Sequence, residues 1–159
     1  MTVDSHQHSS KVTYYKIGLG GEGGKLEEVG EKLKSKNHWR VESFSDIKTL
    51  LGHKDKILDV VKIDIEASEW PALAHMAQTG ELNKVRQLLM EFHVFGGKDA
   101  EVIRRRLAVI RMLEKAGFRV FYTWQYAGWP GIERMTGTYP VMRTITYEVS
   151  FVNINLARP

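Results

Sequence analysis

Residues 57–65, with sequence ILDVVKIDI, constrain the fold of this chain more than any other segment. The segment is short, rich in valine and isoleucine, and nearly continuous in apolar character, which is typical of a strand covered on both faces. Ser68 then offers an N-cap for a helix over residues 69–78, and Gly80 lies where that helix should end. This strand and helix predict a sheet with helices packed against it.

Strands and helices alternate along the rest of the chain. Further strands are expected over residues 85–94, 119–126 and 145–154. A helix over residues 99–115 would place Ile103, Leu107 and Ile110 on one face. The alternation predicts an α/β fold with a mainly parallel sheet and helices on both faces. The last strand follows a loop instead of a helix, so we expect it to be antiparallel.

The size of the chain is that of a single domain. Its 159 residues, 43% of them hydrophobic, are enough for one domain with a real core. No run of about 18 apolar residues is present, so we expect no membrane span in this chain. Residues 1–11 are polar, which predicts a flexible N-terminus without a signal peptide and a cytoplasmic location by default.

The charged and sulfur-containing residues exclude several classes of function. The net charge of +4 is mild, and the short basic clusters are typical of solvated helix faces, so we expect no nucleic-acid partner. The chain has no cysteine, which excludes disulfides, thiolate metal sites and cysteine nucleophiles.

A glycine-rich run, Gly18-x-Gly20-x-x-Gly23, follows a possible strand over residues 12–17. Its spacing is that of a dinucleotide-binding turn, and Glu42 lies about 20 residues on, where a ribose-binding acid is expected. In a dinucleotide-binding fold, the strand before this turn is buried on both faces, yet the strand over residues 12–17 would contain Lys16. Two interpretations stay open: a cofactor loop, or a permissive turn after an edge strand.

The stretch 58–73, LDVVKIDIEASEWPAL, resembles the signature of FkbM-like S-adenosylmethionine-dependent methyltransferases, a methyltransferase-like (METTL-type) family. In that family a buried strand ends in Asp-x-Glu, usually followed by Gly-x-Glu and an aromatic or apolar residue. Ala67 stands where glycine is common. The matching residues are Asp64, Glu66, Glu69 and Trp70.

The resemblance covers nearly the whole chain and implies a Rossmann-like class I methyltransferase fold. It makes residues 1–159 a single, partial domain. In this family the glycine-rich segment near Gly20 follows the third, edge strand. The first strand and the glycine-rich donor loop would then lie upstream, so the resemblance implies that the chain is truncated at its N-terminus.

Four polar side chains end two of the expected strands. Asp64 and Glu66 lie at the end of the strand expected over residues 57–65, and Glu91 and His93 lie at the end of the strand expected over residues 85–94. Ligands bind beyond the carboxyl ends of parallel strands, so these four residues are the candidate catalytic residues. His93 is the candidate base, and Asp64 or Glu91 could orient it.

The resemblance also implies the cofactor and the acceptor. The methyl donor would be S-adenosylmethionine, with Asp4 and Asp64 as candidate donor-binding residues. The acceptor would be a small molecule or a glycan methylated on oxygen. We assign no metal ligand, although the same carboxylates could hold a hard divalent cation. Trp129 and Tyr139, in a long loop over residues 127–143, could line an acceptor pocket or form a lid.

Two other functions compete with methyl transfer. One is an NAD(P)-binding oxidoreductase that uses Gly18–Gly23 and Glu42. The other is a non-catalytic, degenerate methyltransferase fold that binds a partner.

Overall fold

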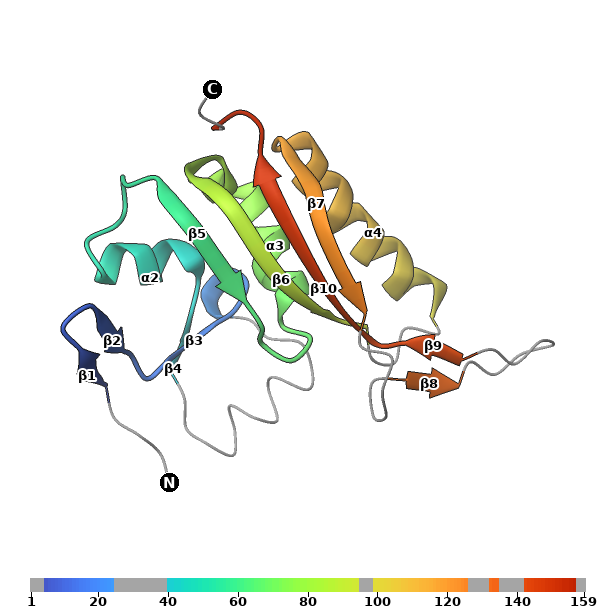
Figure 1. Ribbon diagram of the computed structural model, residues 1–159, viewed down its shortest axis with the longest axis horizontal. Helices are drawn as coiled ribbons and strands as arrows, with labels where there is room; N and C mark the ends of the chain where they lie inside the picture. Colours follow the sequence, from blue (N-terminus) through green and yellow to red (C-terminus); the bar gives the residue numbers. More distant parts are fainter. Residues whose placement is uncertain (1–4, 25–39, 95–98, 126–131, 135–141, 157–159) are drawn as a thin grey trace.

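The computed structural model of the protein describes residues 5–24, 40–94, 99–125, 132–134 and 142–156. Its main sheet has four strands in the order β5-β6-β10-β7 (Figure 1). β5 pairs parallel with β6, and β10 pairs antiparallel with both β6 and β7. Three strands therefore share one direction and β10 opposes them. The predicted α/β class with a C-terminal antiparallel strand is confirmed.

The bounds of the main-sheet strands and of α3 and α4 lie close to those expected, whereas the strand expected over residues 12–17 is divided between β2 and β3 and the segment expected to be flexible contains β1. The main-sheet strands are β5 (Leu58–Ile63), β6 (Val85–His93), β7 (Phe118–Gln125) and β10 (Thr146–Asn153). The helices are α2 (Phe44–Leu50), α3 (Glu69–Gln78) and α4 (Ala100–Lys115), with 3-10 turns η1 (Glu22–Gly24) and η2 (Glu81–Lys84). The short strands are β1 (His6–Ser9), β2 (Val12–Tyr14), β3 (Ile17–Leu19), β4 (Arg40–Glu42), β8 (Ile132–Arg134) and β9 (Met142–Thr144).

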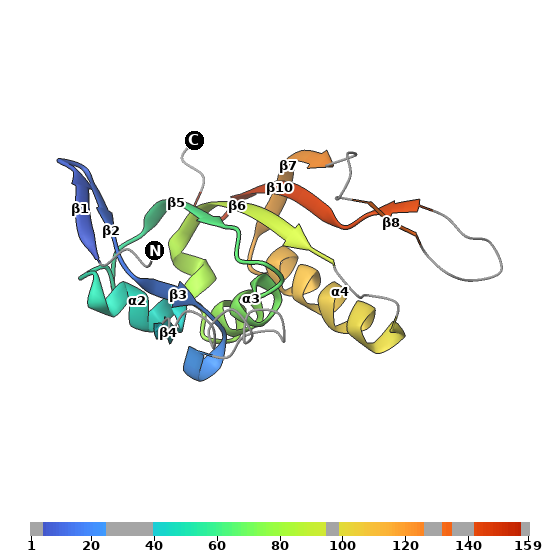
Figure 2. The ribbon, with the colours of Figure 1, turned by 90° about the horizontal axis from the view of Figure 1, so that it is seen from below.

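The hydrophobic core lies between the sheet and helices α3 and α4, which pack against the same face of it (Figure 2). Leu73 and Leu113 contribute from the two helices, and Leu88 and Phe151 contribute from β6 and β10. The last strand alternates between the core and the other face, because Tyr147, Val149 and Phe151 of β10 all belong to this core or pack against it.

The glycine run begins inside β3 and continues beyond its end, and among the described strands β3 pairs only with β4, in a separate two-stranded parallel sheet. Gly20 donates its N–H to the Glu42 carbonyl oxygen, and the Glu42 carboxylate accepts from Arg40. Gly24 has φ +71°, and a Cβ there would overlap the backbone carbonyl of Val41. These contacts support a turn that packs closely against its own chain.

The buried face of α4 differs from the expected one. Ile103 and Leu107 are 41% and 52% exposed, whereas Val109 and Leu113 are buried. The helix carries two apolar stripes, and the stripe with Leu113 turns toward the sheet and α3.

The N-terminus of α3 also differs from the expectation. Ser68 is at the N-cap position as expected, but its side chain forms no capping hydrogen bond.

Some expected features fall outside the described residues. These are Asp4, Trp129 and Tyr139. Within the segment expected to be a long loop, the structure describes strands β8 and β9, which pair antiparallel. Among the described helices, none combines the length and the apolar character needed to cross a bilayer.

Candidate active site

The backbone takes an unusual turn between β5 and α3. Glu66 and Ala67 have φ values of +53° and +72°, in the left-handed region that non-glycine residues rarely occupy. The conformation of Ala67 explains why glycine suits this position. Such backbone strain costs on the order of 1 kcal/mol or more per residue and is common at functional sites.

Glu69 is the most deeply buried acid at this turn, with an exposed fraction of 0%. Its Oε1 accepts a hydrogen bond from the Ile65 N–H at 2.9 Å and lies 2.9 Å from His93 Nδ1. Oε2 is buried and has no hydrogen-bond partner within the described part of the chain. The carboxylate lies in the first turn of α3, where the helix dipole favours negative charge.

His93 ends β6 and is 4% exposed. Its Nε2 lies 3.7 Å from Glu66 Oε2 and 3.6 Å from Glu91 Oε1, so three carboxylates surround one imidazole. Burial by itself lowers the pKa of His93, but the hydrogen bond and charge of Glu69, helped by Glu66 and Glu91, outweigh it. The net effect raises the pKa of His93 above its ordinary value.

Asp64 and Glu91 form a second pair at the same edge. Burial and the nearby charge of Asp64 raise the pKa of Glu91, and the hydrogen bond between the two side chains raises it further. His93 works in the opposite direction and lowers the pKa of Glu91. One ligand atom each from Asp64, Glu91 and His93 lies within 4.8 Å of the others. This spacing suits a cation, whereas the hydrogen bond between Asp64 and Glu91 suits a shared proton.

Trp70 anchors this end of β6. Its Nε1–H donates to the His93 carbonyl oxygen at 2.8 Å, and its ring stacks on Phe92 with 4.8 Å between centroids. The backbone that carries the imidazole is thus fixed from α3 by a hydrogen bond and by ring packing. The imidazole itself is fixed by the Glu69 carboxylate one residue earlier in the same helix.

Comparison with known proteins shows the family of this chain. A family model described as "Methyltransferase domain" matches residues 2–126. The chain belongs to this methyltransferase family. The matched part of the methyltransferase domain includes β5, β6 and all the side chains just described.

Curated relatives agree with this assignment. The methyltransferase domain is 28% identical over 96 residues to "Probable methyltransferase-like protein 24" of Homo sapiens, covering 57% of this chain and 26% of the relative. The protein of the same name from Rattus norvegicus is 30% identical over 74 residues, covering 43% and 20%. The chain therefore spans about a quarter or less of the curated relatives it matches. No solved structure matches the chain significantly.

The structure of the methyltransferase domain brings together Asp64, Glu66, Glu91 and His93, the four candidate catalytic residues. Glu69 was missed as a site residue, although it matched the family signature. A signal was present, because Glu69, Leu73 and Met76 recur at the spacing of one helix face, and all three are fully buried. Such a carboxylate needs a partner inside the protein, and His93 is that partner.

Proposed function

We propose that this domain transfers a methyl group from S-adenosylmethionine to a hydroxyl oxygen of a small-molecule or glycan acceptor. The methyltransferase family supports the reaction class. The observation that carries the proposal is the contact between Glu69 Oε1 and His93 Nδ1, because it prepares an imidazole to act as a base.

His93 is the proposed base. When the ring is neutral, hydrogen bonding to the Glu69 carboxylate keeps the proton on Nδ1 and leaves the lone pair on Nε2. Nε2 points toward Glu66 and Glu91 at the carboxyl edge of the sheet, where a ligand of an α/β fold binds. An acceptor hydroxyl that reaches Nε2 can give up its proton there as its oxygen becomes nucleophilic.

The donor supplies, when bound, an electrophilic methyl group on a sulfonium sulfur, and the sulfur keeps the C–S bonding electrons as the acceptor oxygen forms the new C–O bond. The described residues suit a cationic group, because Asp64, Glu66 and Glu91 gather negative charge at one edge. Asp64 is exposed at the end of β5, whereas Glu66 and Glu91 lie beside His93 Nε2, so Asp64 is the residue proposed to face the donor. Asp4, the other candidate donor-binding residue, lies outside the described residues.

A divalent cation is the alternative occupant of this edge. Asp64, Glu91 and His93 offer two carboxylate oxygens and one nitrogen in suitable proximity, and a cation there could position an acceptor diol. The two arrangements differ in the role of the imidazole, because a nitrogen that binds a cation cannot also accept the acceptor proton. A methylation rate that survives prolonged chelation would favour the base.

The experiment is a transfer assay with the intact protein. S-adenosylmethionine with a labelled methyl group is incubated with fractionated small molecules and glycans, and labelled products are separated and identified. We expect label to appear on oxygen and to disappear in the His93→Gln variant. If calorimetry shows that the donor binds but no labelled product forms, the result would instead favour a degenerate methyltransferase fold that binds a partner without catalysis. Binding of NAD(P) that depends on Gly20 would favour the oxidoreductase.

A further inference from the structure

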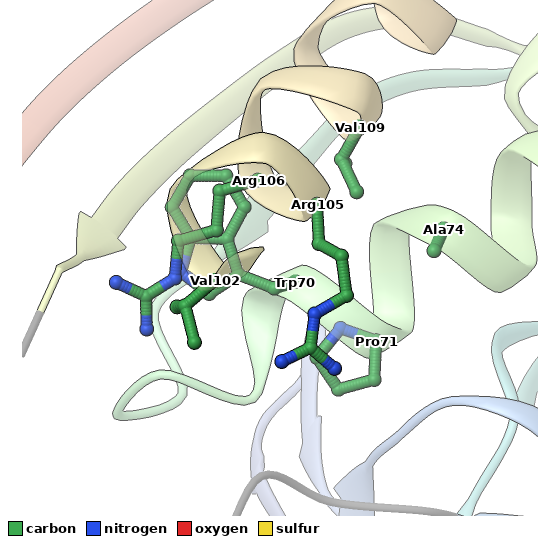
Figure 3. Close-up of a pocket in the computed structure, with 7 residues that line it drawn as sticks. All are labelled: Trp70, Pro71, Ala74, Val102, Arg105, Arg106 and Val109. Carbon is green, nitrogen blue, oxygen red and sulfur yellow. The ribbon is translucent and has the colours of Figure 1, made fainter. Parts of the chain in front are cut away.

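A cavity of about 240 Å³ lies between α3 and α4 (Figure 3). Its apolar surface comes from Pro71 and Ala74 of α3 and from Val102 and Val109 of α4. The side chain of Trp70 forms one wall. This cavity does not contain any of the carboxylates or the imidazole of the candidate active site.

Both charged side chains that line this cavity are arginines. Arg105 and Arg106 extend from α4, and Figure 3 shows their guanidinium groups on either side of Val102. Arg106 lies over the Trp70 ring, with its Cζ 5.3 Å from the centroid. Arg105 is exposed and forms no ion pair or hydrogen bond that involves the described residues. The cavity therefore combines an apolar surface with one exposed guanidinium group, that of Arg105, which the described residues leave unpaired.

We propose that this cavity binds a small organic carboxylate with an apolar body about the size of one ring. Guanidinium groups form planar, two-point contacts with carboxylates, which a single ammonium group cannot reproduce. The apolar lining favours an organic anion over an inorganic one, because inorganic phosphate would leave the Pro71 and Val109 surfaces without a partner. The volume is below the roughly 300 Å³ at which pockets for larger ligands begin, so the ligand must be small.

The cavity is connected to the candidate active site through one side chain. Trp70 lines the cavity with its ring and donates its Nε1–H to the His93 carbonyl oxygen at 2.8 Å. A ligand that packs against this ring changes the surroundings of an N–H that is held at the end of β6. The indole N–H of Trp70 therefore reports occupancy of the cavity directly.

The test is a nuclear magnetic resonance titration of the intact protein carrying ¹⁵N-labelled tryptophan, with Trp70 assigned from the Trp70→Phe variant. The probes are phenylacetate, 2-phenylethanol, which has the same ring without the charge, and inorganic phosphate. We expect phenylacetate to shift the Trp70 signal with a dissociation constant on the order of 1 mM. The other two probes should bind at least about tenfold more weakly.

Two matched variants distinguish specific binding in the cavity from a general attraction of anions to the positive charge of α4. Arg105→Gln should weaken phenylacetate binding by about tenfold, whereas Arg104→Gln removes the same charge from the same helix outside the cavity and should leave it unchanged. Arg104 pairs with Glu101 on the exposed side, so neither substitution removes a core contact. Circular dichroism confirms that both variants fold.

Three results would overturn the proposal. They are no shift of the Trp70 signal with phenylacetate, equal binding of 2-phenylethanol or phosphate, and equal weakening by Arg104→Gln. None of these measurements uses methyl transfer, so the proposed reaction and the carboxylate site can fail independently.

Discussion

Glu69 and His93 are 24 residues apart in sequence, and Glu69 Oε1 lies 2.9 Å from His93 Nδ1 inside the protein. The first residue of α3 is thereby joined to the last residue of β6. A fully buried carboxylate is tolerated because it has the imidazole, the Ile65 N–H and a helix N-terminus around it. The stability of the domain and the chemistry of the site therefore depend on the same contact.

Removing the Glu69 side chain should destabilise the domain. Glu69→Ala leaves the Ile65 N–H and His93 Nδ1 buried without their partner, so the free energy of unfolding should fall by about 3 kcal/mol. Glu69→Gln keeps an acceptor oxygen and should cost about 1 kcal/mol. Urea denaturation measures both. The control is Glu101→Ala on the exposed surface of α4, which should change stability by less than about 0.5 kcal/mol. A loss of that small size for Glu69→Ala would contradict the buried contact.

The protonation of His93 should make stability fall as pH rises. Its pKa is raised above the ordinary 6.5, so its stabilising contribution is complete below about pH 6.5 and is lost as pH rises through the folded-state pKa. The raised pKa of Glu91 acts with the same sign, beginning above about pH 4.5. We expect the decline above pH 6.5 to disappear in His93→Gln. A histidine titration followed by magnetic resonance gives the pKa directly, and a value below 6.5 would refute this prediction.

Asp64 should matter for methyl transfer more than for folding. It is exposed at the end of β5, so Asp64→Asn should leave the urea midpoint almost unchanged while the methylation rate falls more than about tenfold, equivalent to 1.4 kcal/mol in the barrier. Asp59→Asn is the matched control, because Asp59 is an exposed acid at the other end of the same strand, paired with Arg86. Equal rates for the two variants would remove Asp64 from the proposed catalytic residues.

Two neighbouring glycines should respond differently to alanine. Gly23 and Gly24 both have left-handed φ values, which cost an alanine about 1 kcal/mol. A Cβ at Gly23 meets open space, whereas one at Gly24 overlaps the Val41 carbonyl. Gly24→Ala should therefore lower the melting temperature clearly more than Gly23→Ala, with donor affinity unchanged in any variant that folds. Equal melting temperatures would contradict the close packing of this turn.

The order of the elements could be predicted from the sequence because the strongest signals are local. The apolar run expected over residues 57–65 became β5, and the helix expected over residues 69–78 became α3. The convergence of Asp64 and His93 also followed from a general rule, since the carboxyl ends of parallel neighbours meet at one edge.

Other features depend on contacts that no local pattern specifies. Lys48 is 2% exposed and forms an ion pair with Glu81 at 2.7 Å, and these two residues are 33 positions apart. Leu107 of α4 lies in a regular apolar stripe and is still exposed, because tertiary packing selected the other stripe. Glu69 begins α3, where a helix dipole favours an acid, and only the position of His93 reveals its second role.

The position of β10 between β6 and β7 has a consequence for how the protein is made. β7 has no sheet neighbour other than β10 among the described strands, so it cannot join the sheet until residue 153 is available. During synthesis, the backbone groups on the facing edges of β6 and β7 therefore stay unpaired while the residues up to β10 are translated. At about 5–20 residues per second, that wait lasts on the order of seconds, long enough for chaperones to bind. The nascent chain, more than the finished domain, is therefore the form most exposed to misassociation.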